Sequence, residues 1–245
     1  MTAVQELVQD KFATMGLIWR DVREYTYDCT ECTFAIGTNT DAVFWSPSTG
    51  PLMVPENYWR KWLWNVPNHD RGTLGNVLSE VTHEPREGQP TAAYMQFENG
   101  RIYKLWNSGW RQNFTIVIEG PVVQAWLDNG GPDTVGFPAE DRHSFLTSQD
   151  RDLLYHQYVF ETADLVASGI DYDAKTGAHF IPTTMMSTVL WNRNAQRGGT
   201  ISSDVTATTD GKATYLRVDT APGLVMVFVE NNSTLAYEVK KPMLS

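Results

Sequence analysis

Two pairs of acidic residues are the first candidates for acid–base chemistry in this sequence. Glu140 and Asp141 are adjacent, so on an extended strand their side chains point to opposite faces and do not flank one glycosidic bond. Asp171 and Asp173 share a face, a spacing that suits part of a calcium loop, but Lys175 occupies the third oxygen position and no terminal Glu follows. We therefore expect the segment DYDAKTG to form a tight turn instead of a metal site.

Four other side chains could hold a ligand: Trp45, Tyr103, Trp106 and His179. An aromatic face binds the C–H surface of a sugar, and a few fixed hydrogen-bonding groups then orient it. His179 follows the turn in the segment TGAH, where a polar side chain can face a groove. Core packing of the three rings, and a histidine that bonds the backbone of the neighbouring turn, are the alternatives.

The two cysteines, Cys29 and Cys32, stand in the segment CTEC and supply at most half of a tetrahedral zinc site. His69 and His83 could complete it, but neither belongs to a ligand-like pair. Two reduced thiols or a local bridge in a turn is therefore favoured, and neither a metal nor a cofactor is expected. The sequence also lacks G-x-S-x-G, Walker-type and H-E-x-x-H motifs, which is weak evidence against an enzyme.

The charge balance disfavours two classes of partner. With 19 basic and 29 acidic residues the net charge is −10, which opposes a hold on nucleic acid phosphates or on an anionic membrane. A neutral polymer or a protein is the easier partner. Acidic residues near the N-terminus interrupt the basic start and apolar run of a secretory signal, and no stretch is apolar for long enough to span a membrane.

A tryptophan returns at nearly constant spacing, because Trp62, Trp126 and Trp191 are separated by 64 and 65 residues. A strand-like stretch with a small turn precedes each one, and a glycine-centred element follows the first two. The preceding stretches are AVFWSPSTGP (42–51), RIYKLWNSGW (101–110) and IDYDAKTGAH (170–179), and the following elements are RGTLGNVLSE (71–80) and DTVGFPAED (133–141). An internal repeat builds its binding surface by juxtaposing copies, which favours a recognition protein.

The apolar pattern predicts the elements that carry these side chains. Helical spacing from Val4 to Phe12 predicts an amphipathic helix over 2–15, which docks either on this chain or on a partner. A β-rich region over 17–45 follows, with the segment TYDCTECTF read as strand throughout. Proline at its first turn then opens a helix over 55–64.

The second unit follows the same order, with a strand over 93–106, a strand over 113–120 and a short helix that Pro121 opens and glycines end. The third unit begins with a strand over 153–161 and ends near Trp191. Beyond a boundary at about residue 195, the segments TYLRVD and LVMVFVE predict β-hairpins.

This ordered set of elements resembles the LGFP repeat of actinobacterial cell-envelope proteins. The carriers are FWSPSTG (44–50), QFENGRIY (96–103), GPVVQAW (120–126), NGG (129–131), VGFPAED (135–141) and KTGAH (175–179). In the first unit the last element reads TLGNVLSE, without the expected Phe-Pro, and a more worn copy stands at 16–24. The resemblance covers residues 14–195 and is clearest in the middle unit.

The resemblance implies a mainly β fold with short helices, in which about three tandem repeats pack side by side. We expect an N-terminal helix over 1–15, a repeat domain over 16–195 with unit boundaries near 75 and 136, and a C-terminal β segment or degenerate fourth unit over 196–245. The expected core of the repeats consists of Trp62, Trp126, Trp191, Gly75, Gly136, Phe137 and Pro138. Trp45, Trp106 and His179 would then occupy equivalent exposed turns.

For function, the resemblance implies a non-catalytic module that holds proteins to the arabinogalactan and peptidoglycan layers of corynebacterial and mycobacterial walls. Similar repeats occur in products of phages that infect these bacteria. Together with the expected absence of a signal peptide, this favours a homo-oligomeric virion protein of the tail, fibre or capsid-decoration class, made in the host cytoplasm and bound to host wall glycan and other virion proteins. A small wall-degrading hydrolase and a purely structural virion subunit are the alternatives.

Overall fold

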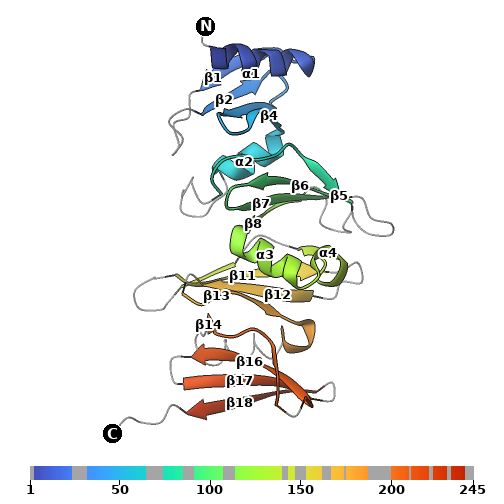
Figure 1. Cartoon of the computed structure of the whole chain (residues 1–245), viewed down its shortest axis with the longest axis vertical. Helices are drawn as coiled ribbons and strands as arrows, with labels where there is room; N and C mark the ends of the chain where they lie inside the picture. The colour runs from blue at the N-terminus through green and yellow to red at the C-terminus, as the bar shows by residue number, and fades with distance from the viewer. Residues whose placement is uncertain are drawn as a thin grey trace. The chain divides into compact units, whose positions relative to one another are not determined.

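The computed structural model describes residues 3–23, 32–64, 74–84, 91–106, 114–139, 143–146, 153–161, 167–173, 175–186, 200–209, 211–220, 223–230 and 233–240 (Figure 1). In these residues the fold is mainly β with a few short helices, as predicted. No helix among them is long and apolar enough to cross a membrane. The chain divides into two compact units, Met1–Gly120 and Pro121–Ser245.

The first unit contains two antiparallel sheets. The first sheet consists of β1 (Trp19–Arg23), β2 (Thr33–Gly37), β3 (Ala42–Ser46) and β4 (Gly50–Val54), and the second of β5 (Thr82–Glu84), β6 (Thr91–Phe97), β7 (Gly100–Trp106) and β8 (Phe114–Glu119). Strand order in both sheets follows the chain. The helices are α1 (Ala3–Thr14) and α2 (Glu56–Trp64).

The second unit contains two further sheets. The third sheet consists of β9 (Phe137–Pro138), β10 (His143–Leu146), β11 (Leu153–Glu161), β12 (Ala167–Asp173) and β13 (Gly177–Ile181). The fourth consists of β14 (Thr200–Ile201), β15 (Thr206–Ala207), β16 (Ala213–Thr220), β17 (Gly223–Glu230) and β18 (Ser233–Lys240), which confirms the predicted C-terminal hairpins. The helices are α3 (Gly120–Asp128), α4 (Gly131–Thr134) and a helical turn at 183–186.

The predicted N-terminal helix forms and docks on its own chain. Val8 and Phe12 of α1 are each 1% exposed and pack against Ala35 of β2 and Val43 of β3. Gly37, at the end of β2, leaves room for this helix, because a Cβ there would lie 2.9 Å from the ring of Phe12. Successive side chains of a strand alternate between faces, so the neighbouring residues point away from α1.

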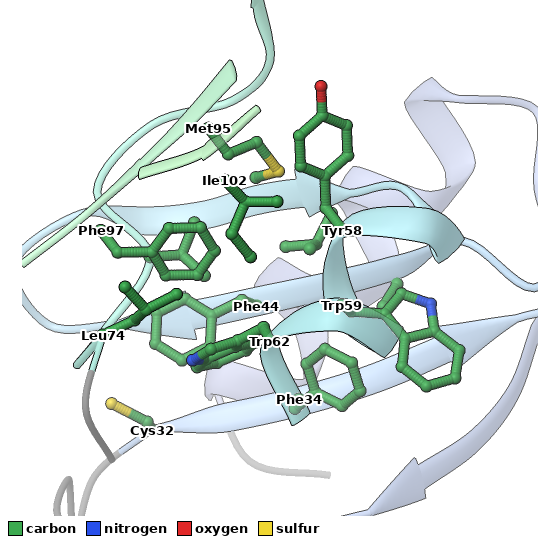
Figure 2. Close-up of a cluster of buried hydrophobic side chains, with 13 residues drawn as sticks. Cys32, Phe34, Phe44, Tyr58, Trp59, Trp62, Leu74, Met95, Phe97 and Ile102 are labelled. Atoms are coloured by element: carbon green, nitrogen blue, oxygen red, sulfur yellow. The ribbon is translucent and has the colours of Figure 1, made fainter. Parts of the chain in front are cut away.

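Those neighbouring residues pack against α2, which lies between the two sheets of the first unit (Figure 2). The ring centroid of Trp62 lies 6.1 Å from Phe34 and 5.6 Å from Phe44 of the first sheet. It also lies 5.6 Å from Phe97 of the second sheet. One tryptophan therefore joins two sheets, which explains its burial at 9% exposure.

The second unit uses similar contacts. Trp126 of α3 is fully buried and stacks on Phe160 of β11, with ring centroids 5.7 Å apart. At the other face of the third sheet, Met185 and Met186 of the helical turn pack with residues of the fourth sheet, Ile201 among them. Each unit thus has the chain order helix, sheet, helix, sheet.

Each glycine-centred element contains a residue or short strand that pairs with a strand of the sheet that follows it in the chain. Val77 forms a bridge with Phe97, and the short strand β9 pairs with the end of β11. Gly75 and Gly136 precede these contacts with φ of 68° and 89°, a backbone conformation that costs other residues free energy.

Two details differ from the sequence predictions. Residues 93–106 form a hairpin of two strands, because Phe97 and Gly100 are register partners around a two-residue turn. The turn residues are Glu98 and Asn99, followed by Gly100, and this polar Glu-Asn-Gly segment is a turn signal that divides the stretch into two strands. The helix α4, which the sequence did not predict, follows the glycines that end α3.

The cysteine segment lies only partly within the described residues. Cys32 directly precedes β2, is 8% exposed and is disulfide-bonded. This supports the local bridge over reduced thiols. Cys29 and the rest of the segment predicted as strand, residues 24–31, lie outside the described residues.

Candidate functional site

The β3–β4 and β12–β13 hairpins share one backbone plan. Three residues separate the strands in each hairpin, and the second strand starts with a glycine of positive φ, Gly50 at 68° and Gly177 at 93°. A proline, Pro55 or Pro182, directly follows the second strand. Positions in the two hairpins can therefore be matched residue by residue.

One row of register partners in the first sheet is apolar. Phe34, Phe44 and Leu52 lie beside one another on β2, β3 and β4. The two phenylalanine rings face Trp62 of α2 and belong to the core of the first unit, and the partly buried Leu52 packs against this core. We call these three residues the apolar row.

The matching row in the third sheet consists of Gln157, Asp171 and His179, which are register partners on β11, β12 and β13. Gln157 is 4% exposed and Asp171 is 2% exposed. Nε2 of Gln157 donates a hydrogen bond to Oδ1 of Asp171 over 3.4 Å. Burying a carboxylate and an amide is costly unless hydrogen bonds compensate, so this polar row needs partners that the apolar row does not.

His179 connects the polar row with the segment between β14 and β15. Its Nδ1 lies 2.9 Å from Oδ1 of Asp204, and its Nε2 lies 2.9 Å from the carbonyl oxygen of Thr176. Both partners are acceptors, so both bonds form together only when each ring nitrogen carries a proton. The His179 side chain is 12% exposed and that of Asp204 is 80% exposed, so the row opens to solvent at this end.

Two hydroxyl groups of the same region are buried. Oγ1 of Thr176 and Oγ of Ser202 find no hydrogen-bonding partner among the described residues. Thr176 supplies the carbonyl that bonds His179, and Ser202 stands two residues before Asp204. Since buried hydroxyls normally form hydrogen bonds, the region around His179 has unused hydrogen-bonding capacity.

Asp173, which lies beyond the polar row on β12, has a local role. Its Oδ1 accepts hydrogen bonds from the backbone N–H groups of Lys175 and Thr176, at 2.6 and 3.2 Å. These bonds fix the turn that precedes β13, as predicted for this segment.

The second sheet carries a cluster of aromatic and polar side chains. Tyr94 and Tyr103 are register partners whose ring centroids lie 5.2 Å apart. Tyr103 is fully buried, and this burial raises the pKa of its hydroxyl above the ordinary tyrosine range. Arg101 lies over Tyr94, with 4.4 Å between its guanidinium carbon and the ring centroid.

The four predicted ligand residues lie in different surroundings. Trp45 is half-buried on the face of the first sheet that α1 covers, whereas His179 lies at the position of Leu52 on the opposite face of its sheet. The two are therefore not at equivalent positions. Tyr103 offers no exposed ring, and Trp106 ends β7 with its side chain outside the described part of the chain.

Of the predicted core residues that the structure describes, Gly75 is half-buried and the others are buried. Trp62 is 9% exposed and Trp126 is fully buried, with its Nε1 donating to the carbonyl oxygen of Gly136 over 3.0 Å. Phe137 and Pro138 are buried and pair with β11. Trp191 lies outside the described residues.

Sequence reasoning did not identify Gln157, Thr176, Asp204 or Arg101. Gln157 lies in a predicted strand, and the strand pattern indicates which face of the sheet its side chain occupies. The pattern does not indicate which residues of neighbouring strands lie beside it. Asp204 belongs to a loop-like segment and reaches His179 across 25 residues of chain. The local sequence carries no signal for such a contact.

Comparison with known proteins identifies no family for this chain. No family model and no curated protein matches it. Among solved structures, it is similar to a chain of AofleA from Arthrobotrys oligospora, with 10% sequence identity and a TM-score of 0.16. The match covers 86% of this chain and 54% of that chain, so this chain spans about half the length of that protein.

Proposed function

We propose that this chain is a non-catalytic recognition protein of the LGFP-repeat type, which binds a hydroxyl-rich cell-wall polysaccharide such as arabinogalactan. The observation that carries the proposal is the polar row of the third sheet, which stands where the first sheet has its apolar row. A buried polar row lowers stability relative to an apolar one, and such a cost is typical of residues with a role in binding.

The chemistry of the row suits a neutral sugar. Sugar hydroxyls both donate and accept hydrogen bonds, and a carboxylate, an amide and an imidazole supply both functions. Asp204, which is 80% exposed, extends this set to solvent, and the buried hydroxyls of Thr176 and Ser202 lie in the same region. The net charge of −10 also suits a neutral polymer better than an anionic one.

The recurring helix and sheet order supports the modular part of the proposal. In each unit a tryptophan of a short helix, Trp62 or Trp126, packs on a phenylalanine at the end of a strand, Phe97 or Phe160. In each unit a glycine with positive φ, Gly75 or Gly136, also precedes the short segment that pairs with the strand carrying this phenylalanine. Repeated modules give avidity for a repeating polymer when several weak sites act together.

The test is co-sedimentation of the purified chain with isolated mycobacterial or corynebacterial walls and with purified arabinogalactan. We expect the parent chain to bind, and His179→Ala and Asp171→Asn to weaken binding at least about tenfold by removing charge-assisted hydrogen bonds. Asp128→Asn, at an exposed position on α3, is the matched control for loss of one negative charge. Trp45→Ala tests whether the predicted ring takes part. No binding by the parent chain would refute the proposal.

A structural subunit without a glycan ligand is the second candidate. The observation that favours it is the His179–Asp204 bond, which ties the third sheet to the segment between β14 and β15 of the fourth sheet. On this alternative the polar row only fixes the two sheets together. It predicts binding to partner virion proteins and none to wall material.

The phage setting and the hydrolase alternative need separate assays. Identification of the chain among the proteins of purified virions, by mass spectrometry, tests the setting. Release of soluble sugar or peptide from the same walls tests hydrolysis, and the turn-forming bonds of Asp173 weigh against a catalytic role for that carboxylate.

A further inference from the structure

Two arginines of the first unit lie over aromatic rings, but they differ in whether a carboxylate forms an ion pair with them. Arg60 lies 5.3 Å from the ring centroid of Trp59 and forms an ion pair with Glu56 at 2.6 Å. Arg101 lies 4.4 Å from the ring centroid of Tyr94, and no carboxylate among the described residues forms an ion pair with it. Arg60 therefore has a carboxylate partner for its charge, whereas the described contacts of Arg101 are with neutral groups.

Neutral groups orient Arg101 closely. Its Nε donates to Oε1 of Gln96 over 2.7 Å, and its Nη1 donates to the hydroxyl of Tyr103 over 3.1 Å. Gln96 is itself fixed, because its Nε2 donates to the carbonyl oxygens of Phe97 and Gly100 at 2.7 and 3.0 Å. The fully buried Tyr103 supplies a rigid base.

These contacts leave part of the guanidinium available. A guanidinium has five N–H donors in a planar fork, and the bonds to Gln96 and Tyr103 use two of them. Arg101 is half-buried, so part of this residue is accessible to solvent. An arginine held in one orientation loses little further entropy when it binds a planar partner.

We propose that Arg101, held by Tyr94, Gln96 and Tyr103, is a binding site for a carboxylate group. A planar fork matches a carboxylate with two parallel N–H···O bonds. The cluster offers one cation, and the charge of Glu84 also acts on the Tyr103 hydroxyl, so a singly charged carboxylate fits better than a doubly charged phosphate. This site is separate from the polar row, and it does not depend on the polysaccharide proposal.

The test is an NMR titration of the full chain with small carboxylates, read at the Nε–H signal of Arg101. Glucuronate and N-acetylalanine are the probes, since one carries its carboxylate on a sugar and the other on a peptide-like group. The methyl ester of N-acetylalanine is the neutral control, and inorganic phosphate is the competing anion. We expect saturable shifts with a dissociation constant on the order of 1 mM for at least one carboxylate, as one charge-assisted contact gives.

Variants localise the effect. Arg101→Gln should weaken binding about tenfold or more, and Arg101→Lys should weaken it less, because lysine keeps the charge but loses the fork. Arg60→Gln, the matched control, should leave binding unchanged. Circular dichroism verifies folding of each variant, and retained binding by a folded Arg101→Lys supports the site if Arg101→Gln does not fold. Equal binding by folded Arg101→Gln, equal binding of the methyl ester, tighter binding of phosphate, or no saturable shift with either carboxylate would each overturn the proposal.

Discussion

The rings of Trp62 and Phe97 lie 5.6 Å apart between α2 and the last residue of β6, and Trp126 and Phe160 lie 5.7 Å apart between α3 and the end of β11. In both units a helix tryptophan is thus placed on the sheet that follows it in the chain. At the first sheet, the helix and the strand contribute a different pair of residues. There the helix supplies Phe12, and Gly37 stands on the strand where the other sheets have phenylalanine.

Replacing each tryptophan by phenylalanine separates packing from hydrogen bonding. Trp126 bonds the carbonyl of Gly136 through Nε1, and no such bond is present at Trp62 in the described residues. Both changes should destabilise, and Trp126→Phe should cost about 1–2 kcal/mol more, because it leaves a buried carbonyl unpaired. Urea unfolding followed by circular dichroism measures the difference. Leu127→Ala, at 42% exposure, is the control, and equal costs for the two tryptophans would contradict the assignment.

The contact between Gly37 and Phe12 predicts energetic coupling. Gly37→Ala places a methyl group 2.9 Å from the Phe12 ring, so it should cost about 1–3 kcal/mol in the free energy of unfolding. In a Phe12→Ala background, which itself should cost about 3–5 kcal/mol, the same change should cost much less. A double-mutant cycle from thermal unfolding measures this coupling. Strictly additive effects would show that α1 does not dock on β2 as described.

Two glycines of the hairpins should respond differently to alanine. A Cβ at Gly100 would meet the carbonyl oxygen of Ile118 and lie 2.7 Å from Leu74, so Gly100→Ala should cost about 3 kcal/mol or more. At Gly177 nothing lies within 4 Å of such a Cβ, and only the φ of 93° opposes alanine. Gly177→Ala should therefore cost about 1–2 kcal/mol. The prediction fails if denaturant midpoints place Gly177→Ala below Gly100→Ala.

Two buried tyrosines predict loss of stability at alkaline pH. Burial raises the pKa of Tyr58 and of Tyr103 in the folded chain. A raised folded pKa means that stability is fully present below the unfolded value of about 10 and falls as pH rises above it. Absorbance at 295 nm should show these two of the ten tyrosines ionising together with unfolding. Reversible ionisation of all ten with unchanged circular dichroism would contradict their burial.

Local patterns predicted much of the fold and little of the site. The helix at 55–64 and the helix opened by Pro121 follow from proline position and apolar spacing, and both form within a residue or two of their expected bounds. The sequence pattern predicts one strand over 93–106, whereas the structure has a hairpin there, because apolar and aromatic residues occur on both sides of the short turn. Buried tryptophans could be expected, since their spacing marked them as parts of a recurring core.

The polar row depends on information that local patterns do not contain. Gln157, Asp171 and His179 stand on three strands, and only the register of those strands makes them neighbours. Likewise, Arg101 and Tyr94 meet through the register of β6 and β7. A one-residue change of register would move each side chain to the opposite face, so composition alone could not place them.

Replacing His179 by leucine tests the central claim most directly, because Leu52 holds the matching position in the apolar row. Binding of the full chain to purified arabinogalactan should be measured by titration calorimetry beside the urea unfolding of the same preparation. The account predicts that His179→Leu unfolds within about 1 kcal/mol of the parent chain and binds the polysaccharide at least about tenfold more weakly. Unchanged binding by a variant of unchanged stability would contradict the claim that the polar row recognises the sugar.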